Sequence, residues 1–271
     1  MTNFTLTGFA DEISPDPNEQ IAVLKETGVG HIELRGIDGK NVLDLSPAEA
    51  EAFRRDLQRA GIGVSAIGSP IGKVQIRSDL EAHFARFQVA VERAAHFATP
   101  NIRLFSFYYE GEEPAAVRGE IIALLRRMAE YAAAAGCTLL HENESRIYGD
   151  TTERCLDLLG SIDHPAFRGI FDPSNFVQCG VDTRQAWHEL AGYVDYFHIK
   201  DSLAATRKVV PAGYGDGHVA WILGQALERG FSGFLSLEPH LAADDPVHGG
   251  SGAERFAKAV DALRQVLAGL E

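Results

Sequence analysis

The chain has 271 residues, 45% of them hydrophobic and 23% charged, which suits one large core and is close to the usual length of a single eight-fold α/β barrel. Its formal charge of −13 argues against a nucleic-acid partner, because a phosphate backbone binds to clustered Lys and Arg. Three cysteines without a CxxC pair, together with the lack of a secretion signal or a long apolar run, predict a cytoplasmic protein with no membrane partner.

Short apolar runs alternate with helical patterns along the whole chain. The runs are flanked by Gly, Pro, Asn or Asp, as buried parallel strands usually are. They predict strands at 6–10, 31–35, 63–68, 101–107, 137–143, 168–173, 194–200 and 231–239. Several helical patterns between them end in a glycine suited to a helix C-cap, such as Gly61 and Gly136. Eight βα repeats, with no GxGxxG after the first strand and no linker, predict one (β/α)₈ TIM barrel domain over residues 1–271.

The four last predicted strands each end in a residue that can bind a divalent metal. The motifs LLHENE, IFDPSN, YFHIKD and LSLEPH place there, in order, Glu142, Asp172, His198 and Glu238. Singly, each has an ordinary explanation as a solvated or core residue, but parallel strand ends converge in a barrel. Three carboxylates and one imidazole suit one divalent ion such as Mn²⁺, Mg²⁺, Co²⁺ or Zn²⁺. Strand alternation also predicts that the residues two positions before three of these ligands face inward, namely Leu140, Ile170 and Tyr196.

With these motifs the chain resembles, over nearly its full length, the xylose isomerase-like TIM barrel superfamily. This superfamily holds sugar phosphate isomerases and epimerases, ketose 3-epimerases and endonuclease IV. The resemblance implies the barrel fold, the four metal ligands, and a role for Glu142 and Glu238 as bases on opposite faces of a ketose-like substrate. Proton transfer would then pass through an enediolate. Because isomerisation, epimerisation and dehydration all begin there, a metal-dependent dehydratase or lyase of a keto-sugar or keto-inositol remains the alternative.

Six further side chains at or near strand ends are predicted to bind substrate: Lys200, Arg103, Lys73, Glu33, Glu12 and His240. Lys200 has the strand parity of His198, and a surface pair with Asp201 is its alternative. Arg103 interrupts an apolar strand, so its guanidinium needs a buried partner, which Glu142 would supply.

The remaining candidates come from the loops and rims. Lys73 ends the SPIGK segment after the third strand, with a solvated turn as the alternative. Glu33 and Glu12 belong to the first two strand ends, where rim ion pairs are also common, and His240 closes the LSLEPH motif. The glycine-rich stretch around GYGDG lacks a following GK[ST], so a lid or a subunit contact is favoured over a phosphate cradle, with Asp216 or His218 reaching the substrate.

Two other classes of protein fit the sequence less well. An endonuclease IV-type nuclease needs extra histidines where this chain has the SPIGK loop, Arg103 and Asn175, and the negative charge also disfavours DNA. A non-catalytic sugar-binding barrel would not need both Glu142 and Glu238 placed as bases. The expected partner is therefore a small-molecule carbohydrate, with a neutral keto-sugar favoured over a sugar phosphate, and a homo-oligomer is plausible.

Overall fold

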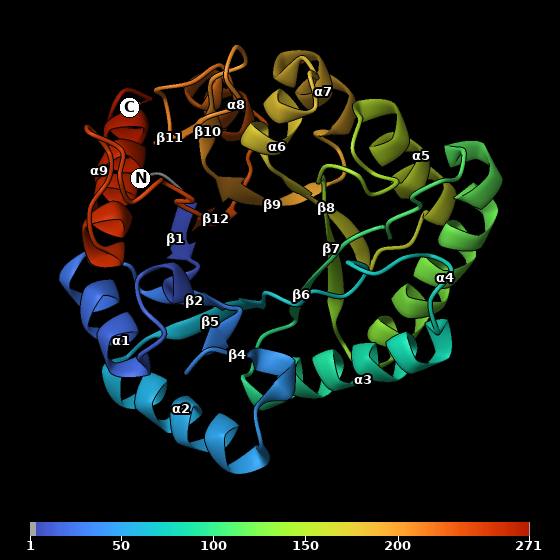
Figure 1. The fold of residues 1–271 in the computed structure, drawn as a ribbon, viewed down its shortest axis with the longest axis horizontal. Coiled ribbons are helices and arrows are strands. Elements are labelled where there is room, and N and C mark those ends of the chain that lie inside the picture. The colour runs from blue at the N-terminus through green and yellow to red at the C-terminus, as the bar shows by residue number, and fades with distance from the viewer. Residues whose placement is uncertain (1–3, 271) are drawn as a thin grey trace.

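Eight parallel strands form the inner wall of the protein and helices surround them, as Figure 1 shows for the computed structural model, which describes residues 4–270. The strands of the wall are β1 (Phe4–Gly8), β2 (His31–Leu34), β5 (Gly63–Ile67), β6 (Asn101–Leu104), β7 (Thr138–Glu142), β8 (Phe167–Phe171), β9 (Val194–Ile199) and β12 (Gly233–Leu237). This arrangement confirms the predicted TIM barrel.

Helices connect these strands around the outside of the barrel. They are α1 (Pro17–Glu26), α2 (Pro47–Ala60), α3 (Leu80–His96), α4 (Pro114–Ala134), α5 (Thr152–Ile162), α6 (Pro173–Gln178), α7 (Thr183–Leu190), α8 (Val219–Glu228) and α9 (Gly252–Ala268). Local sequence sets several of their ends. Ser46 and Ser251 form capping boxes at the starts of α2 and α9, and Gly61 ends α2 with a φ of 73°.

Short elements decorate the loops. Two 3₁₀ turns, η1 (Ala10–Glu12) and η2 (Val42–Asp44), follow the first two barrel strands. Two small antiparallel pairs, β3 (Gly36–Ile37) with β4 (Lys40–Asn41) and β10 (Asp201–Ser202) with β11 (Val209–Val210), extend the loops after β2 and β9. In the part of the chain that the structure describes, no helix has both the length and the apolar character needed to cross a membrane.

The barrel is nearly closed, with one seam. The strand order is β1-β12-β9-β8-β7-β6-β5-β2, and every pairing in it is parallel. The two end strands, β1 and β2, are neighbours in space but no ladder joins them within residues 4–270. Backbone hydrogen bonds therefore leave the wall open at that seam.

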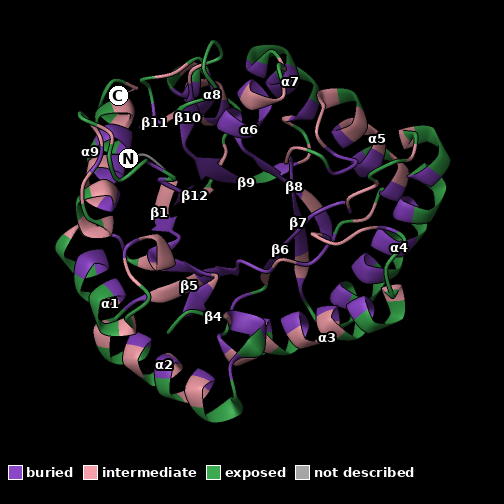
Figure 2. Cartoon of the chain, viewed as in Figure 1, coloured by how far each residue is buried: buried purple, intermediate pink, exposed green. Residues whose placement is uncertain are grey.

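Two apolar layers hold the fold together. The larger lies between the strands and the helices, so that exposed residues are confined mainly to the outer helix faces and the loops (Figure 2). The smaller lies inside the barrel and is made by Ala66, Leu140, Ile170 and Tyr196, with Phe234 packed against them. This cluster confirms the predicted inward direction of three of these side chains.

The structure corrects the limits of several predicted strands. Residues 101–107 were predicted as one strand, but β6 ends at Leu104. Beyond it the backbone pairs with the preceding loop instead: Phe105 N–H donates to the Ile71 carbonyl and Tyr108 N–H to that of Val74. The first strand begins at Phe4, and residues 9–10, also predicted as strand, lie at the turn into η1.

Candidate metal centre

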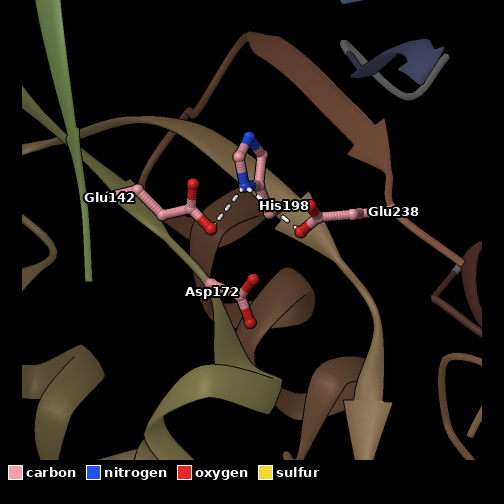
Figure 3. A group of neighbouring side chains, drawn as sticks. All are labelled: Glu142, Asp172, His198 and Glu238. Carbon is pink, nitrogen blue, oxygen red and sulfur yellow. Dashed lines mark ion pairs between the residues drawn. The ribbon is translucent and has the colours of Figure 1, made fainter. Parts of the chain in front are cut away.

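Glu142, Asp172, His198 and Glu238 lie together at the C-terminal ends of four neighbouring strands, as predicted. One ligand atom from each lies within 4.8 Å of the others, and all four side chains are buried. His198 Nδ1 is 3.0 Å from Glu142 Oε1 and 3.8 Å from Glu238 Oε2. The two glutamates lie on opposite sides of the imidazole, with Asp172 below them (Figure 3).

Local sequence fixes the direction of the Asp172 side chain. Asp172 is the N-cap of α6, where its Oδ1 accepts the Asn175 N–H at 2.8 Å and Pro173 takes the first helical position. Its backbone is held as well, because Asn143 accepts the Asp172 N–H at 2.9 Å and donates to the Asp172 carbonyl at 3.0 Å. Its other oxygen, Oδ2, is left to face the cluster.

Asn143 and Asn175 were not among the predicted site residues. Asn175 Nδ2 donates to Glu142 Oε1 at 3.2 Å and to the Asn143 carbonyl at 2.9 Å. These two amides thus tie Glu142 to Asp172. Their closeness in sequence to two ligands was the signal, one and three residues after Glu142 and Asp172, but local pattern does not show where an amide points.

The donor atoms of the cluster fit a divalent cation. His198 Nδ1 is buried without a hydrogen-bond partner, and Asp172 Oδ2 has only a charge contact with Lys200 Nζ at 2.7 Å. An imidazole nitrogen and carboxylate oxygens are ligands that divalent metals accept. Both atoms have only charge contacts with other members of the cluster, and a cation bound among them would coordinate both.

The charged side chains around the cluster also favour a bound cation. Five carboxylates form ion pairs with three cations; the carboxylates are Asp11, Glu12, Glu142, Asp172 and Glu238, and the cations are Arg35, Arg103 and Lys200. A sixth carboxylate, Glu33, pairs with His198, which also contacts Glu142 and Glu238 and so joins these ion pairs into one network. Burial, with the charges of Glu142 and Glu238, raises the pKa of Asp172 to about 6, although Lys200 opposes this. The network therefore carries an excess of negative charge.

The pKa shifts of the ligand side chains also show that the centre of the cluster attracts a cation. Burial lowers the pKa of His198, but the carboxylates of Glu142 and Glu33 raise it by more, to about 10. Burial raises the pKa of Glu142, yet His198 and Arg103 bring it down to about 2. The pKa of Glu238 also lies well below its usual value, since Lys200 and His240 outweigh the effect of burial. Both glutamates are thus ionised at neutral pH.

Lys200 and Arg103 lie against the ligands, as the sequence predicts. The Lys200 ammonium is buried and forms ion pairs with Asp172 and Glu238. The alternative surface pair with Asp201 is wrong. Arg103 Nη1 lies 3.2 Å from Glu142 Oε2, and its Nη2 donates to the Gly68 carbonyl at 3.2 Å.

Glu12 and His240 lie at the mouth of the barrel beside Glu238. His240 Nε2 is 3.1 Å from Glu12 Oε1 and 3.4 Å from Glu238 Oε1. Arg35 completes this rim, with Nη1 3.3 Å from Glu238 and Nε 2.6 Å from Asp11. The end of the HIELR strand favours a rim ion pair for Arg35, with substrate hydroxyls as the alternative; its contact with a ligand carboxylate was not predicted.

Glu33 and Lys73 lie elsewhere. Glu33 is fully buried beneath His198, with its oxygens 3.2 and 3.3 Å from Nε2, rather than at the open mouth. Burial raises the pKa of Glu33, but His198 and Arg103 lower it below its usual value. Lys73 pairs with Glu144 at 3.2 Å and lies 4.2 Å from the ring centre of Phe105.

The SPIGK loop is anchored against β6 and α3. Gly72 has a φ of 88°, and a Cβ there would lie 2.0 Å from the Phe105 carbonyl oxygen. Its N–H donates to His83 Nε2 at 2.9 Å, and burial lowers the pKa of that histidine, which keeps it a neutral acceptor. The loop therefore has a defined path beside the barrel mouth.

The GYGDG loop is closed around a side chain of the protein itself. The buried carboxylate of Asp201 accepts N–H groups from Gly213 at 3.1 Å, Gly215 at 3.0 Å and Gly217 at 2.8 Å. A phosphate would have to displace this carboxylate. Asp216 Oδ2 accepts the Ala204 N–H, and His218 Nδ1 lies 3.0 Å from Thr183 Oγ1, so both predicted substrate contacts have structural partners instead.

Comparison with known proteins identifies the family of the chain and supports its fold. Residues 21–266 match the family model described as "Xylose isomerase-like TIM barrel". A curated relative, the 3-dehydroshikimate dehydratase of Bacillus anthracis, is 23% identical over 185 residues, and the match covers 66% of this chain and 64% of the relative. The chain thus spans less than two thirds of that relative's length.

Solved structures share the whole barrel. The probable 3-DHS dehydratase of petrobactin synthesis from Bacillus anthracis has a TM-score of 0.77 at 19% identity, over 97% of this chain and 99% of that one. The IolI protein, solved with a bound zinc atom, has a TM-score of 0.80 at 15% identity, over 98% and 99% of the two chains. A D-tagatose 3-epimerase-like protein has a TM-score of 0.79 at 15% identity, over 98% of both. At these identities the likeness shows the fold.

Proposed function

Because the chain belongs to the xylose isomerase-like TIM barrel family, we propose that it is a divalent-metal-dependent isomerase or epimerase of a small ketose-like substrate. In this proposal Glu142, Asp172, His198 and Glu238 hold one metal ion. The observation that carries it is the pair of ionised glutamates on opposite sides of His198, in one buried cluster where His198 Nδ1 and Asp172 Oδ2 make no hydrogen bond. Two carboxylates so placed serve as ligands and as bases.

The bound ion would supply the electrophile, stabilising negative charge on a substrate oxygen as the adjacent proton leaves. Glu142 accepts or returns a proton on one face of the substrate, and Glu238 does so on the other. Arg103 and Asn175 hold the Glu142 carboxylate, while Lys200 and Arg35 hold that of Glu238. Each base is thus fixed in direction before the substrate arrives.

The second candidate is a dehydratase of a keto-sugar or keto-inositol. It is favoured by the likeness in sequence and in fold to proteins described as 3-dehydroshikimate dehydratases. The first step would be the same proton removal, after which a β-hydroxyl leaves as water instead of the proton returning. The substrate in either case is a small carbohydrate-like molecule, with a neutral keto-sugar favoured, and the protein is expected to be cytoplasmic and plausibly a homo-oligomer.

Proton exchange with solvent tests the proposal. A panel of ketoses incubated in heavy water with metal-loaded protein is expected to gain deuterium at the α-carbon, followed by NMR. Glu238→Gln is expected to abolish this exchange because the second base is lost. Undiminished deuterium uptake by Glu238→Gln would overturn its role as a base.

The matched control is Glu81→Gln, which changes an exposed carboxylate of α3 that pairs with Arg127 of α4, outside the cluster. It is expected to keep the wild-type rate, within about twofold, since it removes no group from the proposed chemistry. Metal content should be measured for each variant, so that a lost base is distinguished from a lost ligand. A product with a new conjugated double bond and one water fewer would select the dehydratase.

A further inference from the structure

A column of buried polar side chains runs inside the barrel beneath the metal cluster. It consists of Glu33, Tyr196, Ser65 and Thr7, each no more than 1% exposed. Tyr196 OH donates to Glu33 Oε2 at 2.9 Å, Ser65 Oγ lies 2.9 Å from Tyr196 OH, and Thr7 Oγ1 lies 2.7 Å from Ser65 Oγ. Glu33 completes the column at its upper end, against His198 Nε2.

The direction of these hydrogen bonds follows from the carboxylate. An ionised carboxylate only accepts, so Tyr196 gives its proton to Glu33 and must accept from Ser65, which in turn accepts from Thr7. His198 likewise donates to Glu33 through Nε2–H. Nδ1 is therefore the ring nitrogen that would bind the metal, and it lies among the ligand carboxylates, 3.0 Å from Glu142 Oε1.

The column also crosses the seam of the barrel. Thr7 belongs to β1 and Glu33 to β2, the two end strands that no ladder joins in the described chain. Ser65 on β5 and Tyr196 on β9 connect them through the interior. Ser65 Oγ also lies 3.2 Å from the Ile32 carbonyl of β2. Side chains thus join strands that the backbone leaves unpaired.

We propose that Glu33 is a positioning residue for the metal ligand His198, held in place by the Tyr196, Ser65 and Thr7 hydroxyls, so that the geometry of the metal site depends on this column. Glu33 then orients the ring and selects its tautomer instead of binding substrate. The carboxylate–histidine–metal arrangement is one in which such partners tune metal affinity. The inference rests on the proposed metal site.

Metal affinity tests it without any substrate. Glu33→Gln leaves the four cluster ligands intact. The NH₂ group of the glutamine would face one of the two hydrogen-bond donors, Tyr196 OH or His198 Nε2–H, so one of these hydrogen bonds is lost. We expect Co²⁺ to bind this variant about 10–100-fold more weakly than wild type in calorimetric titration. We also expect an altered visible spectrum of the Co²⁺ protein, which a change in stability alone would not produce.

Tyr196→Phe and Thr7→Val probe the column farther from the metal. Both keep side-chain shape and remove one hydroxyl, and both are expected to weaken Co²⁺ binding by roughly two- to tenfold. Asp201→Asn is the matched control, because it alters a buried carboxylate outside the column and is expected to lower stability without changing Co²⁺ affinity.

The outcomes are separable. Wild-type affinity and spectrum in Glu33→Gln or in Tyr196→Phe would overturn the role of the column while leaving the metal site standing. A wild-type protein that binds no divalent metal would overturn the metal-dependent function and this inference together. If Glu33→Gln does not fold, Tyr196→Phe decides the matter alone.

Discussion

At the scale of single residues, Asp201 explains why the glycine-rich loop has its sequence. Its carboxylate accepts four backbone N–H groups, those of Ser202, Gly213, Gly215 and Gly217. A Cβ on Gly215 or Gly217 would lie 2.5 or 2.6 Å from Asp201 Oδ1. The glycines are therefore needed because the backbone approaches an internal anion, and not because the loop binds an external one.

Asp201→Asn is expected to lower the free energy of unfolding by about 2–4 kcal/mol, because an amide group would face N–H donors that the carboxylate now satisfies. Urea unfolding followed by circular dichroism measures this. Asp216→Asn, in the same loop but with one backbone partner, should cost much less. Equal losses in the two variants would contradict the assigned role.

At the scale of elements, the loops after the strands decide the shape of the barrel mouth. Gly72 brings the SPIGK loop against the end of β6, and Asp172 starts α6 while facing the cluster. Asp172, directly after β8, both turns the chain and presents a carboxylate to the cluster, whereas Gly72 sets only the path of its loop. The site is thus built from turns whose conformation the barrel holds fixed.

Gly72→Ala is expected to lower the free energy of unfolding by roughly 2–4 kcal/mol, because a positive φ and a clash with the Phe105 carbonyl act together. Gly39→Ala is the control: Gly39 has a φ of 70° but nothing within 4 Å of its Cβ position. It should cost about 1–2 kcal/mol, the conformational part alone. Thermal unfolding of both variants separates the two contributions, and identical losses would show that the close approach does not matter.

At the scale of the whole molecule, the interior of the barrel concentrates negative charge. Six carboxylates pair with four cations, Arg35, Arg103, Lys200 and His198, in one network that reaches from the rim to the centre of the barrel. Burying unbalanced charge lowers stability, so a divalent ion bound there would stabilise the entire fold as well as serve catalysis.

Treatment with a chelator is therefore expected to lower the Tm, and added Mg²⁺, Mn²⁺ or Zn²⁺ to restore it. At a free metal concentration a hundredfold above Kd, binding contributes about 2.7 kcal/mol to stability. Differential scanning calorimetry measures the shift, with KCl at equal ionic strength as the control. A Tm that no divalent ion changes would argue against a metal centre in this cluster.

Sequence reasoning reached the barrel and the four clustered residues because both depend on regular patterns. Strand alternation and the order of repeats place Glu142, Asp172 and their partners at equivalent strand ends without knowledge of any contact. The position of Glu33 could not be predicted in this way. Strand alternation predicts that the Glu33 side chain points into the barrel, but it does not predict how deep it lies. Its depth, which brings it beneath His198, depends on the offsets between neighbouring strands of the barrel. The backbone N–H groups around the Asp201 carboxylate likewise depend on contacts within a loop, and the sequence of that loop has no regular repeat.

The pairing of β1 has a consequence for how the chain is made. Among the strands of the wall β1 is synthesised first, yet its ladder is with β12, the last of them. The other strands can pair in the order of their synthesis, from β2 to β12. At roughly 5–20 residues per second, β1 waits on the order of tens of seconds for its partner. A premature stop late in translation would thus leave the beginning of the chain unpaired as well as its end.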